Sequence, residues 1–448
     1  MANTVLLISD EHNPFYTSLY GHATVQTPGM ERLASEGTRY SNTYCPSPLC
    51  MPCRSAFMSG KWVHQIQAYS NCNVNVDPTP PTYGAVMARQ GVHTVHIGKT
   101  HVYDSGENLG FSQMILGGAF KRPGDANQRR NPLAVRPDGA QRANGYGPRD
   151  NAAHSDLEKI DAALDWLRNT APTLDKPWVL SVNISNPHFP HYTSQELWDM
   201  YPSGGDLPEH GLDCPSAQHP YAQDLRTHFQ TGQFNGEQTR GLRRGYLGCV
   251  TFVDRQLSRL MDTLEQTGQR DRTNLIYTSD HGEMLGKFGM WWKCSLYDHA
   301  SRVPLIAAGP DFQQNHTVHT PVSLLDLQAT LFRNTGVERP GNWQGTPLQD
   351  IPDSDPTRPV FAEYHGHGTR ASAYMIRKGP WKYIHYIAAP HQLFNLETDP
   401  EELDNIIAAH PDVAADMEKD LRAVCNPERE NDRAEAFIQA QLAAIESY

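Results

Sequence analysis

The most reactive pattern in the chain is the pentapeptide CMPCR at residues 50–54, a cysteine followed by a proline and an arginine. Pro52 suits the first turn of a helix, because it gives up only an amide that has no partner within the helix. Cys50 would then lie at the positive end of that helix, where backbone amides favour an anion. Arg54 follows four residues later and projects from the same helix face. The spacing predicts a cysteine, a helix N-terminus and a guanidinium around one site for a tetrahedral oxyanion.

Two pairs of adjacent residues could bind a metal ion beside this cysteine. Asp10 and Glu11 follow one apolar run, and Asp280 and His281 follow another. Carboxylate oxygens and an imidazole are suitable ligands for a divalent cation. Each aspartate taken alone could equally be a helix cap. Because both pairs occur together with the pentapeptide, we predict that they hold a metal ion.

Four basic side chains could serve the same site. Lys99 and His101 are two residues apart, so both would face one cleft on extended backbone. His188 lies on a loop stiffened by two prolines, and Lys293 follows the segment with Asp280 and His281. Plainer interpretations exist for three of them: a surface lysine for Lys99, a snorkelling lysine for Lys293, and one of 21 histidines for His188.

Four short apolar runs would bring these residues to one place. They span residues 5–9, 92–97, 178–183 and 275–279, and each ends in polar residues. Continuous apolar strands indicate a sheet covered on both faces. In open α/β sheets, ligands bind beyond the carboxyl ends of the strands. We therefore expect the polar ends to share one cleft, although they are far apart in the chain.

Helical patterns lie between the expected strands. Ser155 and Glu158 have the spacing of a capping box, and apolar residues at helical spacing follow them. A second helix is predicted for residues 244–267. Alternating strands and helices are typical of a doubly wound α/β fold. The stretches 105–150 and 202–240 have the composition of long loops, which we place at the rim of the cleft.

The composition changes after about residue 340, which predicts two domains. We expect a catalytic α/β domain over residues 1–355, with a large, mostly parallel sheet sandwiched by helices. A smaller C-terminal α+β subdomain would span residues 356–448 and carry an antiparallel sheet. Within it, residues 373–377 and 381–386 are predicted to form a hairpin.

Composition excludes several classes of partner. The formal net charge of −12 argues against nucleic acid, because phosphate binding favours a basic surface. Eight cysteines in 448 residues are too few for a disulfide scaffold. No apolar run approaches the roughly 20 residues needed to span a bilayer. The first residues lack a basic stretch followed by an apolar one, so we expect a cytoplasmic protein without a membrane partner.

Five segments, in this order along the chain, resemble signatures of the sulfatase branch of the alkaline-phosphatase superfamily. Residues 27–37 resemble its TPN-x-D-x-LA-x-x-G segment, and residues 50–60 resemble its C-x-P-S-R-A-S-x-x-TG signature. Residues 98–101 resemble GKWH, and residues 279–282 resemble SDHG or SDNG. Residues 393–402 resemble L-x-L-x-x-DP-x-E-x-x-N. The resemblance covers nearly the whole chain and implies an alkaline-phosphatase-like fold and hydrolysis of sulfate esters.

The resemblance implies a modified nucleophile and a metal ion. Cys50 would be oxidised to formylglycine by a formylglycine-generating enzyme, a partner needed during maturation. The implied ligands of Ca²⁺, or of Mn²⁺ or Mg²⁺, are Asp10, Glu11, Asp280, His281 and the modified Cys50. One hydroxyl of the hydrated aldehyde would attack sulfur, helped by metal binding that lowers its pKa.

The resemblance also implies roles for the basic residues. Those that would neutralise the charge on the transferring group are Arg54, Lys99, His188 and Lys293. His188 or Lys293 would protonate the departing oxygen. His101 would help the second hydroxyl to lose its proton, which expels sulfate and restores the aldehyde.

Three positions depart from the family pattern. Cys53 stands where serine or alanine is usual, and Glu11 stands where aspartate or glutamine is commoner. His281 stands where many sulfatases have asparagine. An Asp-His pair there occurs in sulfatases and in phosphonate monoester hydrolases, so it leaves sulfur and phosphorus chemistry both open.

Three alternatives follow from the same residues. A phosphonate monoester or phosphodiester hydrolase would use the same nucleophile and metal. A structural zinc site could use Cys45, Cys50, Cys53 and Cys72, although no second tight pair completes the spacing. A thiol enzyme with unmodified Cys50 would fit a cysteine pair at a helix start, but it would leave the carboxylates unexplained.

The expected substrate is a small sulfate ester of a sugar or an aryl alcohol. Residues that could line its pocket are Tyr103, His191, Trp291, Trp292 and the segment 364–368. The aromatic residues could equally belong to the core. The sequence leaves the oligomeric state open, a homo-oligomer included.

Overall fold

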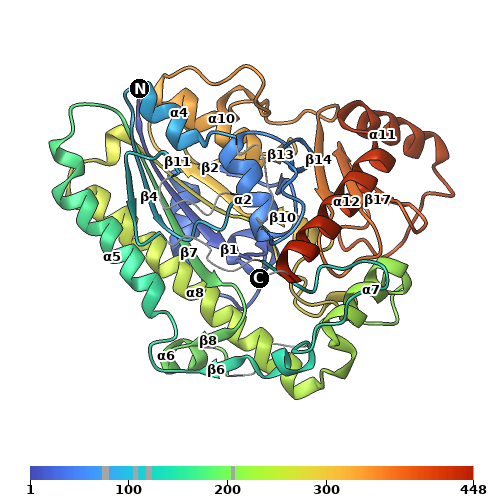
Figure 1. The fold of residues 1–448 in the computed structure, drawn as a ribbon. Helices are drawn as coiled ribbons and strands as arrows, with labels where there is room; N and C mark the ends of the chain where they lie inside the picture. Colours follow the sequence, from blue (N-terminus) through green and yellow to red (C-terminus); the bar gives the residue numbers. More distant parts are fainter. Residues whose placement is uncertain (73–79, 104–108, 118–123, 203–206, 447–448) are drawn as a thin grey trace.

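A computed structural model describes residues 1–72, 80–103, 109–117, 124–202 and 207–446 of the chain. Its centre is an eight-stranded sheet in the order β12-β2-β11-β9-β1-β7-β4-β5 (Figure 1). The strands are β1 (Asn3–Asp10), β2 (Gly37–Tyr40), β4 (His93–Gly98), β5 (Gln113–Ile115), β7 (Trp178–Pro187), β9 (Thr273–Ser279), β11 (Leu305–Ala308) and β12 (His316–Val318). No helix in the described ranges is long and apolar enough to cross a membrane.

The four strands predicted from the sequence are neighbours in the middle of this sheet. β9, β1, β7 and β4 are mutually parallel, whereas β11 runs antiparallel to β9 and to β2. Their side chains are buried almost throughout, as continuous apolar strands in a covered sheet require. The predicted mostly parallel sheet is confirmed.

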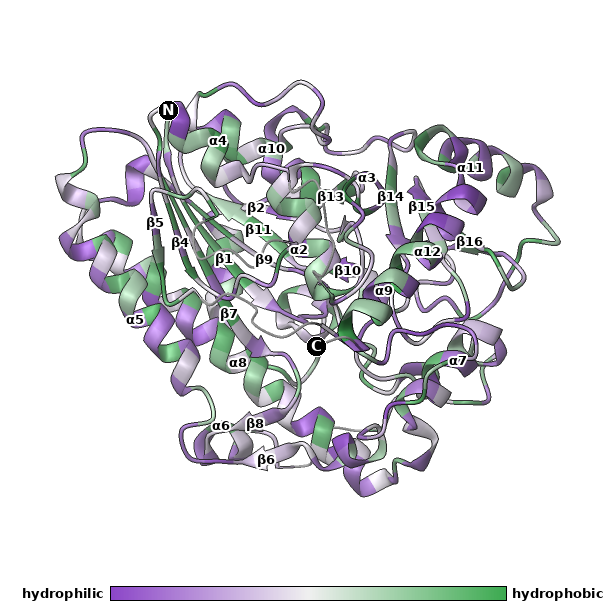
Figure 2. Ribbon diagram, in the orientation of Figure 1, coloured by the Kyte–Doolittle hydropathy of each residue, from purple (hydrophilic) through white to green (hydrophobic). Residues whose placement is uncertain are grey.

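Helices cover both faces of the sheet. Alternate side chains of each strand point to opposite sides, and both sets are apolar, so each face must be buried. Val5 and Leu7 of β1 pack in one cluster with α1, α5 and α8, whereas Leu6 and Ile8 pack with α2, α4 and α10. These helices are α1 (Pro28–Ser35), α2 (Cys50–Ser59), α4 (Tyr83–Arg89), α5 (His154–Asn169), α8 (Gly236–Gln266) and α10 (Leu324–Thr335). Figure 2 shows hydrophobic central strands and mixed character on the covering helices.

The register of the strands aligns their carboxyl ends. Ser9 of β1 pairs with Ser279 of β9, so the residues that follow, Asp10 and Asp280, leave the sheet side by side. On the other side of β1, Asp10 is level with Pro187 of β7. The strand ends that carry the predicted site residues therefore meet at one edge.

A second sheet of four antiparallel strands forms from β14 (Pro359–Tyr364), β15 (Ala373–Lys378), β16 (Trp381–Tyr386) and β17 (Gln392–Asn395). The predicted hairpin is β15 and β16 and is confirmed. Helix α11 (Pro411–Val424) packs on one face, and α12 (Pro427–Glu446) follows it. The other face shares an apolar cluster with the rim of the central sheet. The domain boundary at residue 355 stays a prediction.

The remaining elements are short and lie mainly around the sheet edges. The helices are α3 (Val63–Ile66), α6 (Gln195–Asp199), α7 (Pro220–Phe229) and α9 (Asp298–Ser301). The strands are β3 (Thr43–Tyr44), β6 (Tyr146–Pro148), β8 (His191–Thr193), β10 (Arg302–Val303) and β13 (Val322–Ser323). β10, β3 and β13 form one small sheet, and β6 pairs with β8.

Three local predictions were wrong in detail. Ser155 lies inside α5, which begins at His154 without a side-chain cap, so there is no capping box. α8 begins at Gly236 and not near residue 244, because Asn235 and Gln238 form a capping box there. The expected loop over 202–240 contains α7 and the start of α8; parts of it and of 105–150 lie outside the described residues.

A buried ion cluster ties the C-terminal sheet to the central domain. Lys382 of β16 donates at 2.6 Å to both Asp298 Oδ1 and Glu402 Oε1, and its side chain is fully buried. The Asp298 amide donates to the other oxygen of Glu402 at 2.7 Å. A buried charge lowers the stability of the fold unless it is paired with an opposite charge.

Lys382→Met should lower the free energy of unfolding by about 3–5 kcal/mol, because it leaves buried Glu402 without its cation and Asp298 with the more distant Arg302, at 3.7 Å. Urea denaturation monitored by fluorescence measures the effect. Lys378→Met is the matched control, because this lysine of β15 pairs with half-exposed and exposed aspartates. It should cost about 0–1 kcal/mol. Equal losses in the two variants would contradict the ion-cluster account.

Candidate active site

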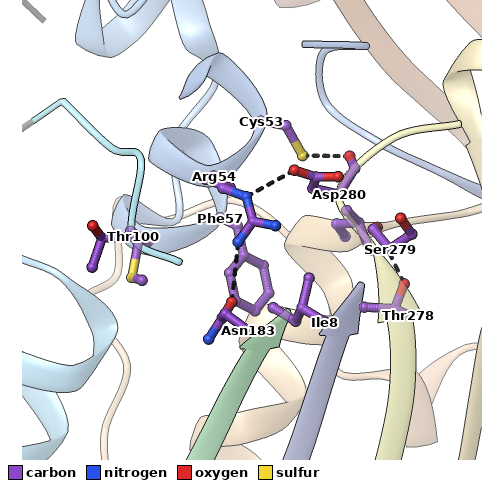
Figure 3. A pocket seen from close by; sticks show the side chains of 11 residues that line it. Ile8, Cys53, Arg54, Phe57, Thr100, Asn183, Thr278, Ser279 and Asp280 are labelled. Carbon is purple, nitrogen blue, oxygen red and sulfur yellow. Dashed lines mark hydrogen bonds and ion pairs between the residues drawn. The ribbon is translucent and has the colours of Figure 1, made fainter. Parts of the chain in front are cut away.

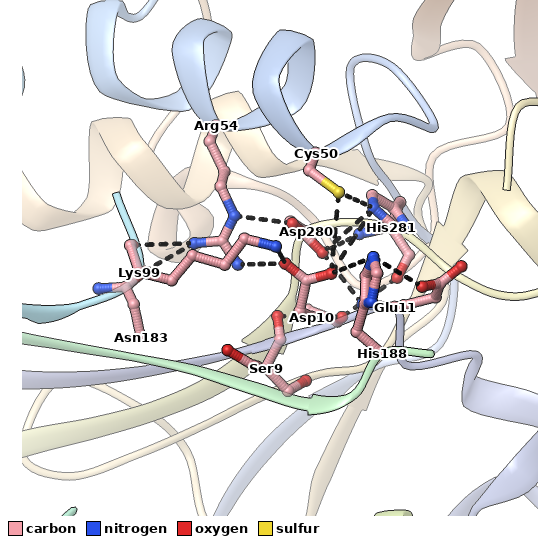
Figure 4. Close-up of polar contacts among 12 residues, drawn as sticks. Ser9, Asp10, Glu11, Cys50, Arg54, Lys99, Asn183, His188, Asp280 and His281 are labelled. Carbon is pink, nitrogen blue, oxygen red and sulfur yellow. Dashed lines mark hydrogen bonds and ion pairs between the residues drawn. The ribbon is translucent and has the colours of Figure 1, made fainter. Parts of the chain in front are cut away.

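Cys50 is the first residue of α2, and its side chain points at the ends of the central strands (Figure 4). Leu49 is extended, so the chain turns into the helix at Cys50, as predicted. The Cys50 Sγ lies 3.1 Å from His281 Nε2 and 3.8 Å from Asp10 Oδ1. It also shares a hydrogen bond with His101. The thiol is thus the point at which α2 meets the strand ends.

Arg54, one turn further along α2, holds two carboxylates together. Its Nε donates to Asp280 Oδ2 at 2.7 Å, and its Nη2 donates to Asp10 Oδ2 at 3.0 Å. Nη1 donates to Asn183 Oδ1 at 3.1 Å. The Arg54 side chain is 5% exposed, and its hydrogen bonds hold the Asp10 and Asp280 carboxylates in place. Its predicted contact with the transferring group stays a prediction.

Two lysines and a histidine surround these acids. Lys99 Nζ contacts Asp10 Oδ2, and Lys293 Nζ donates to Glu11 Oε2 at 2.9 Å. Lys293 Nζ also lies 2.6 Å from His188 Nε2. Burial would raise the pKa of Glu11, but Lys293 and His188 lower it to about 2, so Glu11 is ionised. His188 and Lys99 are 29% and 20% exposed, which places these two at the opening of the site.

The charges around Cys50 favour an anion at its side chain. Burial would raise the pKa of the thiol, but Lys293, Lys99 and His281 outweigh burial and lower it well below the usual value. Burial would lower the pKa of His281, yet Asp280 and Cys50 raise it to about 10. A negatively charged oxygen in place of the sulfur would meet the same attraction. The predicted residues therefore converge, and they form a site suited to an oxyanion.

Comparison with known proteins decides the family. A family model described as "Sulfatase" matches residues 2–337, and another, "N-sulphoglucosamine sulphohydrolase, C-terminal", matches residues 286–427. The chain belongs to the sulfatase family. It is accordingly a hydrolase that acts on sulfuric ester bonds.

Relatives match this sulfatase over most of their length. It is 30% identical to arylsulfatase K of Danio rerio, over 94% of this chain and 83% of that protein. It is 31% identical to the choline-sulfatase of Rhizobium meliloti (strain 1021), over 85% of this chain and 78% of that protein. The family resemblance inferred from the five motifs is thereby confirmed.

Two solved structures share its fold. The phosphonate monoester hydrolase of Agrobacterium radiobacter matches with a TM-score of 0.76 and 21% identity, over 95% of each chain. A protein solved with its substrate D-glucosamine-2-N,6-O-disulfate matches with a TM-score of 0.75 and 21% identity, over 97% of this chain and 99% of that chain. The predicted alkaline-phosphatase-like architecture is confirmed.

The site residues of the sulfatase fit a divalent cation. Within the described ranges, two groups of candidate ligand atoms each lie within 4.8 Å of one another: Asp10, Cys50, Asp280 and His281, and Asp10, Glu11 and His188. Asp10 Oδ1 is 4.0 Å from His281 Nε2 and 3.8 Å from His188 Nε2. Carboxylate oxygens with one imidazole suit a divalent cation. The structure brings the predicted ligands together, but it groups Glu11 with His188 and not with Asp280.

Tyr246 and Asn183 support the site, and neither was named from the sequence. Tyr246 of α8 donates to the Glu11 carbonyl at 2.8 Å and accepts from the Asn13 amide at 2.9 Å. It shapes the turn after β1, in which Glu11 has a φ of 68°. Asn183 orients Arg54 and ends a predicted strand, so its position was a usable signal. Tyr246 lies inside a long helix, where no sequence pattern marked it as a residue of the site.

Glu283 fixes the backbone before Lys293. Its Oε1 accepts from the Trp292 amide at 2.6 Å and from the Leu285 amide at 2.9 Å. Burial and the nearby Glu11 raise its pKa well above the usual value. This buried acid, three residues after Asp280, therefore fixes the backbone position from which the Lys293 side chain extends.

Cys53 packs behind the site, apart from the candidate metal ligands found among the described residues. Its Sγ donates to the Asp280 carbonyl at 2.8 Å, beside a cavity of about 20 Å³ lined also by Phe57 (Figure 3). That volume is close to the space of one water molecule. Within the described residues, Cys45, Cys53 and Cys72 lie outside both groups of candidate ligands, which disfavours the zinc alternative.

The aromatic residues proposed to line a substrate pocket are mostly core. Tyr103, Trp291 and Trp292 are 2%, 3% and 1% exposed. His191 is also buried, with its Nδ1 against the Leu242 carbonyl at 3.1 Å. The core interpretation is therefore the better one for these side chains.

Adding Ca²⁺ to the chelator-treated sulfatase should raise its melting temperature, because a ligand that binds only the folded state stabilises it. The rise should grow with pH up to the His281 pKa of about 10, because the cation must displace that proton. Asp280→Asn should shrink the rise. Differential scanning fluorimetry measures it, and Asp353→Asn is the control, since Asp353 is exposed and paired with His316. A wild-type response in Asp280→Asn would contradict this ligand assignment.

Proposed function

We propose that this sulfatase cleaves the sulfate ester of a sugar or aryl alcohol at sulfur, with Cys50 oxidised to formylglycine. The observation that carries the proposal is the position of the Cys50 Sγ. It lies at the start of α2, 3.1 Å from His281 Nε2, among acids that are themselves paired with Lys99 and Lys293. The sulfur stands in for the hydroxyls of the hydrated aldehyde, and that aldehyde would supply the nucleophilic oxygen.

A divalent cation, with Ca²⁺ our first choice, would be held by Asp10, Glu11, Asp280 and His281. Bound there, it would act as a Lewis acid that lowers the pKa of an oxygen at position 50 and polarises the sulfate group. Arg54 prepares this site, because it holds Asp10 and Asp280 in place from behind. We therefore assign Arg54 a positioning role in addition to its charge.

The basic residues at the opening would bind the sulfate group and move protons. Lys99 and His188 are the more exposed, so both can approach the sulfate oxygens. His188 Nε2 and Lys293 Nζ are 2.6 Å apart, so one proton can be shared between them and passed to the departing oxygen. His101 contacts the Cys50 side chain and would take up the proton released there.

The substrate class and the surroundings of the protein are part of the proposal. A fold relative was solved with a disulfated glucosamine, which supports a sulfated sugar as substrate. We also propose a formylglycine-generating enzyme as the maturation partner, since residues 50–54 keep the Cys, Pro and Arg that its recognition motif needs. A cytoplasmic location and the oligomeric state stay predictions from the sequence.

In active protein, the tryptic peptide that contains Cys50 should have the mass expected after replacement of the thiol by an aldehyde. Cys50→Ala should lose nearly all sulfatase activity, because the nucleophile is gone. Peptide mass spectrometry and initial rates on an aryl sulfate measure these effects. Cys53→Ser is the control and should keep both the modification and the activity. Active enzyme with unmodified thiol at Cys50 would sink the formylglycine proposal.

The purified enzyme should hydrolyse an aryl sulfate with a higher kcat/KM than the matched aryl phosphonate monoester. The reason is that its curated relatives at 30–31% identity are sulfatases, whereas the phosphonate hydrolase shares the fold at 21%. Steady-state rates on 4-nitrophenyl sulfate and 4-nitrophenyl phenylphosphonate, which release the same phenol, provide the comparison. A clear preference for phosphorus would favour the phosphonate monoester hydrolase instead.

A further inference from the structure

A guanidinium beside the active site is surrounded by three aromatic rings. The Arg142 Cζ lies 5.7 Å from the centre of the Phe189 ring, 5.7 Å from that of Phe229 and 6.0 Å from that of Trp292. Phe189 and Trp292 also contact each other, with ring centres 4.2 Å apart. Distances of this size allow cation–π attraction from each ring.

The turn that carries Arg142 packs closely through the glycines at its ends, against the Phe229 backbone and the Phe189 ring. Arg142 belongs to a 3₁₀ turn, Ala140–Asn144. A Cβ on Gly139 would lie 2.6 Å from the Phe229 carbonyl oxygen, and one on Gly145 would lie 2.3 Å from the Phe189 ring. Neither position has space for a larger residue, so the turn packs closely and the place of the Arg142 side chain is well defined.

Two of the rings adjoin residues of the active site. Phe189 directly follows His188, and Trp292 directly precedes Lys293. His188 and Lys293 are the pair proposed to pass a proton to the departing oxygen. The rings around Arg142 thus come from the two segments that carry the proposed proton-passing pair, so we place Arg142 beside the departing alcohol or phenol. The half-exposed side chains of Arg142, Phe189 and His188 open on this side.

Arg142 keeps most of its hydrogen-bonding capacity for a ligand. Among the described residues, its ion pair is made through Nε to Asp138 Oδ2 at 3.3 Å, and that aspartate is 60% exposed. Surface pairs of this kind are weak and exchange readily with solvent. Arg136, on the other side of Phe229, is by contrast held by the well-buried Asp125.

We propose that Arg142 recognises a second anionic group, a carboxylate or a further sulfate, on the leaving group of the substrate. Planar guanidinium donors match such groups with two parallel hydrogen bonds. The arrangement also excludes cationic leaving groups, because the aromatic surface that would attract a quaternary ammonium is already filled by Arg142. The inference rests on the proposed sulfatase reaction at Cys50.

The test compares aryl sulfates that differ in charge: 4-nitrophenyl sulfate, 3- and 4-carboxyphenyl sulfate, and 4-(trimethylammonio)phenyl sulfate. For each ester, the kcat/KM of Arg142→Gln is divided by that of the wild type, which cancels the intrinsic reactivity of the leaving group. The ratio for at least one carboxylated ester should fall about tenfold or more below the ratio for 4-nitrophenyl sulfate. The ratio for the trimethylammonio ester should lie above the ratio for 4-nitrophenyl sulfate.

Arg149→Gln is the matched control. Arg149 stacks on Tyr192 with its Cζ 5.1 Å from the ring centre, and it is exposed on a neighbouring segment. For Arg149→Gln, the ratio of its kcat/KM to that of the wild type should be the same for all four esters. Arg142→Lys keeps the charge but loses the planar fork, so it should show a smaller loss confined to the carboxylated esters. If Arg142→Gln does not fold, the kcat/KM ratios of Arg142→Lys for the carboxylated esters and 4-nitrophenyl sulfate decide whether Arg142 recognises the anionic group.

The outcomes separate this inference from the proposed function. Equal ratios for all esters in both Arg142 variants, or an Arg142→Gln ratio for the trimethylammonio ester below that for 4-nitrophenyl sulfate, would overturn the role of Arg142 and leave the sulfatase proposal intact. Wild-type enzyme with formylglycine at position 50 that hydrolyses none of the esters would overturn the proposed function and this inference with it.

Discussion

The buried contact of Arg54 with two aspartates is the interaction on which the site depends. Asp10 and Asp280 carry like charges in a dry interior, so holding them side by side costs free energy unless a cation is paired with both. Arg54 provides that cation from α2, the helix that also begins with Cys50. One guanidinium thus ties the nucleophile-bearing helix to the ends of β1 and β9.

The sheet supplies the other half of this constraint. β1 pairs in parallel with β7 and β9, and the apolar side chains on both faces fix its register through opposite helix layers. A slip by one residue would exchange the two faces and separate Asp10 from Asp280. The same packing that stabilises the fold therefore sets the distances within the site.

Chemistry and selectivity lie on different parts of the chain. Cys50 and Arg54 are fixed by helix α2 and buried, whereas Lys99 follows the end of β4 and is 20% exposed at the opening of the site. The leaving-group side is formed by loops around His188 and by the turn around Arg142, held by close ring packing. Loops on a rigid frame can change in sequence without moving the nucleophile.

The sequence alone indicated the family and the central strands, but it left sulfur and phosphorus chemistry both open. Adjacent acids at strand ends, a C-x-P-x-R helix start and parallel apolar runs are local patterns, and each reports its own segment. The start of α8 and the cap at Ser155 were predicted wrongly although both are local features, since the capping box of Asn235 and Gln238 lies within four residues of sequence. The contacts made by Tyr246 and the enclosure of Arg142 by rings from three segments depend on side chains distant in the chain. Packing decides them, because no local pattern records which distant surfaces will meet.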